Sequence, residues 1–260
     1  MFRSLQVAAT GMTAQETMLD TIANNLANAN TTGYKAQHVE FEDLIYQNAR
    51  TAGPVDGGAI TPTSVQVGTG SRVVATTRAF SQGAMQQTGN PLDVAIEGSG
   101  FLAVMQPSGQ LAYTRAGSLK LDAQGRLSTS SGLVVEPPIT VPSNATAVTI
   151  SASGAVSITQ PNQTTPTTVG QLQLTMFPNP NGLNAVGHNL FEPSGSSGEP
   201  ITGLPGANGA GTILQGSLES SNVDVVSEMV NLIGAQRAYE INSKVVSAAD
   251  QMLQNATQMR

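Results

Sequence analysis

The first thirty residues carry the pattern on which the fold depends. Residues 5–26 read LQVAATGMTAQETMLDTIANNL. Large apolar residues recur in it every seven positions, at Leu5, Met12, Leu19 and Leu26, with Ile22 between them. A stripe this narrow is typical of an α-helix that packs against one other helix. The turn-forming run from Asn28 to Gly33 predicts where that helix ends.

The C-terminal region has the same seven-residue period. Asp224 lies directly before its apolar stripe and Glu228 near the start of the stripe, where a helix dipole favours negative charge. Helices of this length are marginally stable alone, so we expect each terminal helix to need a helical partner, of which the other terminus is the nearest. The candidate assembly residues from both stripes are Leu5, Met12, Leu19, Ile22, Leu26, Val225, Met229, Leu232, Tyr239, Val246 and Leu253.

Between the two helical regions the pattern changes to short segments in which apolar and polar residues alternate. This period of two predicts β-strands, and the short turns between them predict antiparallel pairing. The predicted strands are residues 93–97, 101–105, 119–121, 146–150, 156–158 and 172–176. The fold class is therefore α+β, with coiled-coil-like terminal helices flanking an all-β middle, either an antiparallel sandwich or a distorted barrel.

These patterns predict the domain boundaries. Residues 1–35 and 218–260 form a helical domain, 73–191 a β domain, and 192–217 a linker that returns to the C-terminal helix. Residues 36–72 include the stretch 47–71, which is rich in Gly, Pro and Thr and fits neither period. Such long segments are either functional or disordered, and both readings stay open on the residues alone.

Composition narrows the classes of partner. Charged residues make up only 11% of the 260, against about 25% in an average soluble domain, and the formal net charge is −6. A chain without a basic patch is a poor ligand for nucleic acid or an anionic membrane surface. No apolar run is long enough for a membrane span or a signal peptide, so we expect a soluble protein, exported, if at all, without a cleaved signal.

Few residues suggest a catalytic, cofactor-binding or metal-binding site. Residues 98–103 (GSGFLA) match the letters of a dinucleotide-binding fingerprint, but a second strand is predicted after them where that site needs a helix. Cysteine is absent, and His38 and His188, the only histidines, lack acidic or histidine neighbours at metal-ligand spacing. We expect no catalytic residue, no bound cofactor and no metal site.

Several motifs resemble those of the flagellar rod and hook proteins. The N-terminal motif is ANNLAN at 23–28 followed by TGYK at 32–35, and the C-terminal one is AQRAYE at 235–240 with DQML at 250–253. In the middle, NPLDVAI at 90–96, Gly100-Phe101, and YTR at 113–115 with Gly117 look like the β domain of that family. Tyr34 stands where Phe is expected, which keeps the aromatic ring.

The resemblance has functional implications. The segment between 41–46 and 67–70 is typical of the distal rod members, whereas hook proteins are usually longer. Membership implies export by the flagellar type III apparatus and polymerisation into a helical tube that crosses the periplasm within the basal body as a drive shaft. The implied partners are further copies of the chain, the proximal rod and hook proteins, and the surrounding bushing rings. Residues 47–71 would then bridge neighbouring subunits.

Three alternatives remain open at this stage. The chain could be a proximal rod or hook subunit, which polymer curvature would distinguish. It could be a β-rich enzyme with helical oligomerisation arms, for which a cleft lined by carboxylates or histidines would speak. It could also be a surface-binding β module, although six Phe, four Tyr and no Trp offer little for an aromatic platform.

Overall fold

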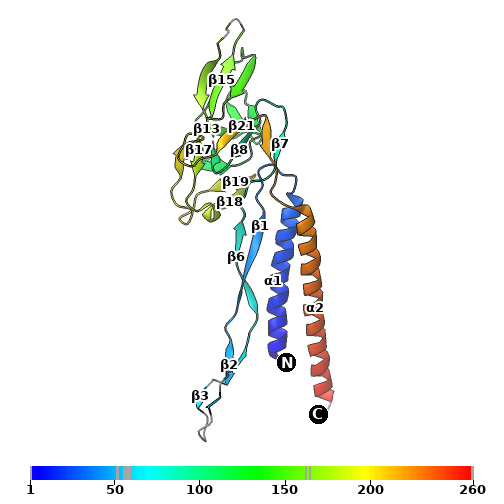
Figure 1. The fold of residues 1–260 in the computed structure, drawn as a ribbon. Coiled ribbons are helices and arrows are strands. Elements are labelled where there is room, and N and C mark those ends of the chain that lie inside the picture. Colours follow the sequence, from blue (N-terminus) through cyan, green and yellow to red (C-terminus); the bar gives the residue numbers. More distant parts are fainter. Residues whose placement is uncertain are drawn as a thin grey trace. The chain divides into compact units, whose positions relative to one another are not determined.

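The computed structural model describes residues 2–50, 53–54, 60–61, 63–161, 163 and 165–258. Along the sequence, a long helix precedes a middle region of antiparallel strands and a second long helix follows it, which confirms the α+β class (Figure 1). The chain divides into two compact units. We call residues 1–27, 37–77 and 224–260 the helical unit, and residues 28–36 and 78–223 the β unit.

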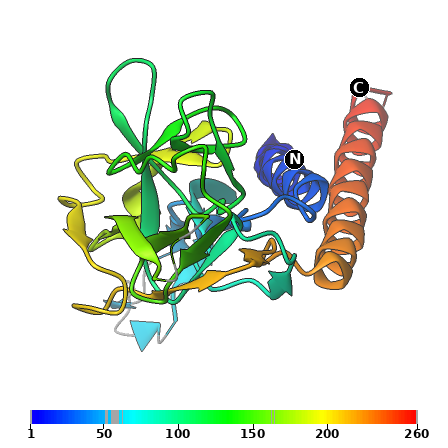
Figure 2. The same cartoon turned by 90° about the horizontal axis from the view of Figure 1, so that it is seen from above.

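Both predicted terminal helices are present in the helical unit. Helix α1 spans Phe2–Ala27 and helix α2 spans Val225–Gln258. They lie side by side and antiparallel, so that the two chain ends are at the same end of the pair (Figures 1 and 2). No helix in the described part of the chain is long and apolar enough to cross a membrane.

A two-stranded ribbon completes the helical unit. Strand β1 (Gln37–Asp43) pairs with β6 (Ser71–Arg78), and beyond them β2 (Gln47–Arg50) pairs antiparallel with β5 (Val65–Val67). Short strands β3 (Gly53–Pro54) and β4 (Ile60–Thr61) follow toward the tip. Much of the segment predicted as an extended strap is thus hydrogen-bonded hairpin, while residues 51–52, 55–59 and 62 lie outside the described residues.

The ribbon approaches α1 at Gly70. This glycine has a φ of +117°, and a Cβ atom built on it would lie 2.1 Å from Thr10 Oγ1. Only a residue without a side chain fits there in that backbone conformation. The close approach explains why a glycine stands directly before the return strand β6.

The β unit is built around a nine-stranded sheet. Its main path runs β11-β12-β13-β9-β10-β19-β18, with β17 pairing both β9 and β20. The strands are β9 (Phe101–Met105), β10 (Leu111–Thr114), β11 (Leu119–Leu121), β12 (Leu127–Thr129), β13 (Val134–Glu136), β17 (Leu174–Met176), β18 (Asn184–Gly187), β19 (Leu190–Glu192) and β20 (Ile201–Gly203). A 3₁₀ turn, η1 (Pro180–Gly182), precedes β18.

Three smaller sheets also belong to the β unit. Strands β14 (Ala147–Ile150), β15 (Ala155–Thr159) and β16 (Thr167–Gln171) form a three-stranded antiparallel sheet. Strand β21 (Thr212–Gln215) pairs with β8 (Val94–Glu97), and β22 (Ser217–Glu219) pairs with β7 (Met85–Gln87). In the described residues the strand order of these antiparallel sheets does not close into a barrel.

Strand β9 shows why the core forms here. Its alternating residues face opposite ways, and both faces are buried: Leu102 and Val104 join the main aliphatic core, whereas Phe101 and Ala103 join an aromatic cluster. In that cluster the rings of Tyr113 and Phe177 pack edge to face, with their centres 4.8 Å apart. A strand buried on both faces explains the continuous apolar run at 101–105.

The predicted boundaries differ from the observed units in four places. Residues 192–217 contain β20 and β21, so this segment belongs to the β unit and is not a linker. These two strands read ITG and TILQ, and neither shows the clear alternation of apolar and polar residues by which a strand is recognised in sequence. Residues 28–36 and 218–223 also belong to the β unit. Most of β6 (Ser71–Arg78) lies inside the predicted β domain, but this strand pairs with the ribbon strand β1.

Candidate assembly surfaces

The helix pair has a seam of small side chains. Ala8 and Ala14 of α1 and Ala235 and Ala249 of α2 are buried. At Gly11, an added Cβ atom would lie 2.9 Å from the side-chain amide of Asn242, so the two helices approach closely there. These small residues allow the backbones of the two helices to come close together.

The eleven predicted assembly residues fall into three groups. Ile22 is buried. Seven others are half-buried: Leu5, Met12, Leu19, Leu26, Leu232, Val246 and Leu253. Val225, Met229 and Tyr239 are exposed. The single stripe read from the sequence of α2 is therefore divided between a half-buried part and an accessible part.

Helix geometry explains part of this division. A straight helix has 3.6 residues per turn, so positions seven apart drift by about 20° per heptad around its axis. From Val225 to Leu253 the stripe passes through four heptads and moves toward the row of Ala235 and Ala249, which faces α1. Val225, at the start of the stripe, consequently remains outside the seam, whereas the drift does not account for the exposed Tyr239 in its middle.

A polar contact that the sequence did not reveal closes one end of the helix pair. The buried side-chain amide of Asn25 donates hydrogen bonds to Glu228 Oε1 at 2.9 Å and to the carbonyl of Gln37 at 2.8 Å. The backbone N–H of Gln37 donates to Asn25 Oδ1 at 2.9 Å. One side chain thus joins α1, α2 and the start of the ribbon. The only sequence signal was an Asn within an apolar helical stretch.

Helix α2 carries a second apolar face that the seven-residue stripe did not include. Its members are exposed, up to 72% for Val226, although they are aliphatic. They are Val226, Val230, Ile233, Ile241, Val245 and Met252. Their spacings of three, four, seven and eight residues place them along one side of a helix. An accessible aliphatic row of this length is a feature of surfaces that bind another protein.

The ribbon also exposes apolar side chains. Ile45 is 85% exposed, and Phe41, Tyr46, Val65 and Val74 are exposed as well. A hydrogen bond with Asp43 raises the pKa of the Tyr46 phenol, and the negative charge of Asp43 adds to that effect. Unpaired edges and apolar side chains together make a two-stranded ribbon a surface suited to further pairing or packing.

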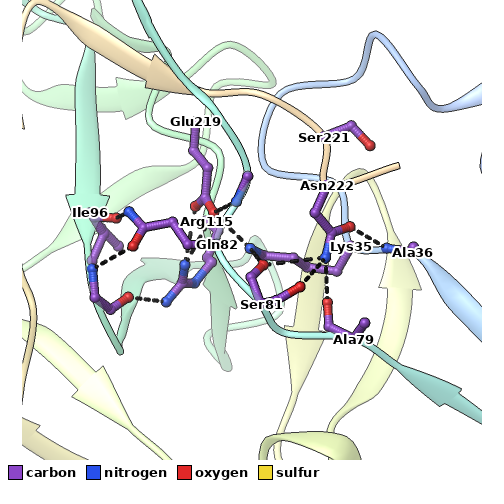
Figure 3. Close-up of polar contacts among 12 residues, drawn as sticks. Lys35, Ala36, Ala79, Ser81, Gln82, Ile96, Arg115, Glu219, Ser221 and Asn222 are labelled. Carbon is purple, nitrogen blue, oxygen red and sulfur yellow. Dashed lines mark hydrogen bonds and ion pairs between the residues drawn. The ribbon is translucent and has the colours of Figure 1, made fainter. Parts of the chain in front are cut away.

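A buried charge cluster lies in the β unit (Figure 3). The ammonium of Lys35 contacts Glu219 Oε1 at 2.6 Å, and Arg115 Nη1 contacts Glu219 Oε2 at 3.1 Å. All three side chains are almost inaccessible to solvent. Burying charges is unfavourable unless each one is paired and hydrogen-bonded, and this cluster satisfies both conditions.

Backbone groups complete the cluster. Lys35 Nζ donates to the carbonyl of Ser81 at 2.6 Å, and Glu219 Oε1 accepts from the backbone N–H of Gly83 at 2.9 Å. Burial lowers the pKa of the Lys35 ammonium, the hydrogen bond with Glu219 opposes that shift, and the charge of Arg115 adds to it.

Nearby, the Asn222 side chain accepts from the Ala36 N–H and donates to the Ala79 carbonyl, each at 2.7 Å (Figure 3). Together with the Lys35 cluster it ties together the segments by which the chain enters and leaves the β unit.

The same cluster explains the glycine-rich motif at 98–100. Residues 98–100 form the turn between β8 and β9, and the strand after them confirms that no helix follows. The guanidinium of Arg115 donates to the carbonyls of Gly98 and Gly100. Within the described ranges, no group of three His, Asp or Glu side chains is placed to hold a metal ion.

Comparison with known proteins gives consistent matches along the chain. Residues 5–35 match the model described as flagella basal body rod protein, and residues 214–259 match the flagellar basal body rod FlgEFG protein C-terminal model. Residues 95–158 match the flagellar hook protein FlgE/F/G D1 domain model. The chain is 48% identical to the flagellar basal-body rod protein FlgG of Caulobacter vibrioides, over 99% of both chains. The chain belongs to the flagellar basal-body rod protein family.

Other members of the rod protein family are similar over their whole length. The FlgG protein of Borreliella burgdorferi is 48% identical over 100% of this chain and 99% of its own. That of Bacillus subtilis is 37% identical over the full length of both. Each of the three segments matched by a rod or hook family model contributes one member of the buried cluster: Lys35, Arg115 and Glu219.

Proposed function

We propose that this chain is a structural subunit of the bacterial flagellar distal rod, which polymerises with itself into a helical tube and transmits motor torque to the hook. The observation that carries the proposal is the second apolar face of α2, in a chain similar along its full length to rod proteins. The face remains accessible after α2 has packed against α1, so it is available to another molecule.

The geometry of this face suits a polymer. A helical tube requires head-to-tail contacts between different surfaces of neighbouring copies, because identical surfaces meeting each other close into a dimer. The helical unit offers several such surfaces: the second apolar face, the exposed residues Val225, Met229 and Tyr239, and the apolar side chains of the ribbon. Fully burying one large aliphatic side chain contributes about 1.5–3 kcal/mol, so six in a row favour a stable contact.

The eleven residues of the two heptad stripes have two roles in this proposal. The buried and half-buried ones hold α1 and α2 together within a subunit, and the exposed ones contact neighbouring subunits. The terminal helices would form the wall of the tube, with residues 36–72 as a bridging element between subunits. The pairing of β1 with β6 and of β2 with β5 supports the latter role, since a hydrogen-bonded ribbon is stiffer than a loop.

The remaining partners follow from the same proposal. Subunits would leave the cell through the flagellar type III export apparatus and assemble in the periplasmic part of the basal body. Proximal rod and hook proteins would contact the two ends of the polymer, and the bushing rings would surround it. A proximal rod or hook subunit is the less favoured alternative, because several relatives matched over their whole length are named FlgG.

Electron microscopy of the purified chain under polymerising conditions tests the proposal. We expect straight tubes, with α-helical density in the wall. Curved, supercoiling tubes would favour a hook subunit, and a protein that remains monomeric at high concentration, with both helices folded, would contradict the proposed assembly.

A further inference from the structure

The β unit also contains a cavity that borders the buried charge cluster at Lys35. This cavity of about 290 Å³ lies between the β18–β19 hairpin and the segment that carries Tyr34 and Lys35. The hairpin turns through His188 and Asn189, whose φ angles are +53° and +58°. This conformation is uncommon outside glycine. It is held by a 2.9 Å hydrogen bond from the Asn189 amide to the carbonyl of Thr32.

Arg78 lines this cavity at the end of β6. Its guanidinium stacks over the ring of Phe191, 5.5 Å from the ring centre. Burial lowers the pKa of Arg78, and the nearby hydroxyl of Tyr34 opposes that shift. The guanidinium is therefore partly removed from water and fixed in orientation.

Arg78 differs from comparable arginines in lacking a counterion. Arg72, Arg115 and Arg126 each form an ion pair with a carboxylate. In the described part of the chain, Arg78 has neither an ion pair nor a hydrogen bond from its guanidinium. A partly desolvated charge without a partner is unfavourable, and binding an anion would remove that penalty.

The cavity wall has the corresponding charge. Its described lining includes Arg78, Lys35 and His188 but no aspartate or glutamate, in a chain whose net charge is −6. The ammonium of Lys35 is already engaged by Glu219, so Arg78 provides the available positive charge, with Tyr34 and His188 beside it as hydrogen-bonding groups.

We propose that this cavity binds a small oxyanion, a carboxylate or a phosphate, through the guanidinium of Arg78. A guanidinium presents two parallel N–H donors that match both oxygens of a carboxylate or two of a phosphate. The volume is several times the share of about 30 Å³ that one water occupies, so the group and its hydration fit. The anion is either free in solution or a carboxylate side chain of a second copy, and this second source rests on the proposed function.

The two histidines allow a direct test on the full-length monomer. His188 lines the cavity, whereas His38 lies on β1 in the helical unit and serves as an internal control. Acetate or inorganic phosphate is titrated at constant pH and ionic strength while the imidazole NMR signals are recorded. We expect a saturable shift of His188 with no comparable shift of His38. Arg78→Gln should weaken this binding at least about tenfold, and the exposed control Arg72→Gln should leave it unchanged.

Two results of this titration would each contradict the proposed site. Equal, non-saturating shifts of both histidines, or an Arg78→Gln variant that titrates like the parent, would overturn the site. The critical concentration for polymerisation then shows whether the anion comes from solution or from a second copy. A higher critical concentration for Arg78→Gln, with inhibition of parent assembly by phosphate, assigns the anion to a second copy. An unchanged critical concentration with intact binding of free anions assigns it to solution. Because the titration uses the monomer, a failure to polymerise does not affect it.

Discussion

Asn25 and Glu228 are joined by a hydrogen bond of 2.9 Å although 203 residues separate them in the chain. The bond connects the last turn of α1 to the first turn of α2, and both side chains are buried. The rest of the seam contains mainly alanines and half-buried aliphatic residues, which can slide along one another. A buried polar pair fixes the register of two helices because a shift would leave its atoms unpaired.

Replacing Asn25 tests this role. Asn25→Ala removes the amide that contacts Glu228 and Gln37, leaving a buried carboxylate without this donor. We expect the free energy of unfolding of the helical unit to fall by about 1–3 kcal/mol. Chemical denaturation followed by circular dichroism measures it, with Asn255→Ala on the exposed side of α2 as control. Equal stability of the two variants would contradict the role of Asn25.

Glu219 should be the most sensitive charged residue of the β unit. Glu219→Ala leaves Lys35 and Arg115 buried without their common counterion, which typically costs about 3–5 kcal/mol. Glu42→Ala removes the partner of Arg72 in an exposed ion pair, where the loss is at most about 1 kcal/mol. Urea unfolding of both variants checks the difference, and a Glu219→Ala protein as stable as Glu42→Ala would show that the cluster contributes little.

The start of α2 should respond to acid. Asp224 accepts hydrogen bonds from the Ser227 hydroxyl at 2.7 Å and from the Val226 N–H at 3.0 Å, as a helix N-cap does. The hydrogen bond with Ser227, and to a smaller extent that with Val226, lowers the pKa of Asp224 below its usual 3.8. A depressed folded-state pKa means that the stabilisation is complete above 3.8 and is lost as the pH falls through the folded-state value.

Asp224→Asn isolates that effect, since Asn caps helices without titrating. We expect the parent to be more stable at neutral pH and the difference in melting temperature to shrink below pH 3.8. Parallel pH profiles of the two proteins would show that the charge of Asp224 has no role.

The parts of this structure that sequence could predict are those encoded locally. The two helices and six of the 22 strands in the described residues were recognisable because a period of seven or of two runs along a continuous stretch of sequence, as at Leu5–Leu26 and in β9. The buried cluster could not be found in this way, because Lys35 and Glu219 are 184 residues apart and each resembles an ordinary surface charge in sequence. Topology alone brings them together.

The second apolar face of α2 illustrates a different limit. The heptad stripe selected one row of residues, and its drift across a 3.6-residue helix concealed that Val230 and Ile233 form another row. Both rows consist of apolar residues spaced three, four or seven positions apart, so the sequence pattern alone does not show which residue belongs to which row. Only burial in the structure separates the residues that face α1 from those that remain accessible.

Substitutions on that second face should separate assembly from folding. Val230→Asp or Ile233→Asp places a carboxylate on a surface that is exposed in the monomer, so the folding cost is only the helix propensity of Asp, less than about 0.7 kcal/mol. In a polymer the same carboxylate would be buried without a partner, and we expect tubes to be absent. Ser243→Asp, at an exposed position outside the face, is the matched control. Normal tubes from Ile233→Asp would exclude this face from the subunit contact.

The final prediction concerns the ribbon between β2 and β5. Arg50 and Val65 are register partners at the last described pair before the tip strands, so replacing residues 51–64 by Asn-Gly would close a two-residue hairpin there. Loop closure entropy depends weakly on length, so the melting temperature of the monomer should change little. If the segment bridges neighbouring subunits, its removal should let them slide past one another and give bent or irregular rods.

A variant with the segment scrambled at constant length separates the effect of sequence from that of length. The measurement is filament curvature in micrographs of parent and variants side by side. Straight rods of equal stiffness from the shortened protein would mean that this segment is a dispensable surface loop.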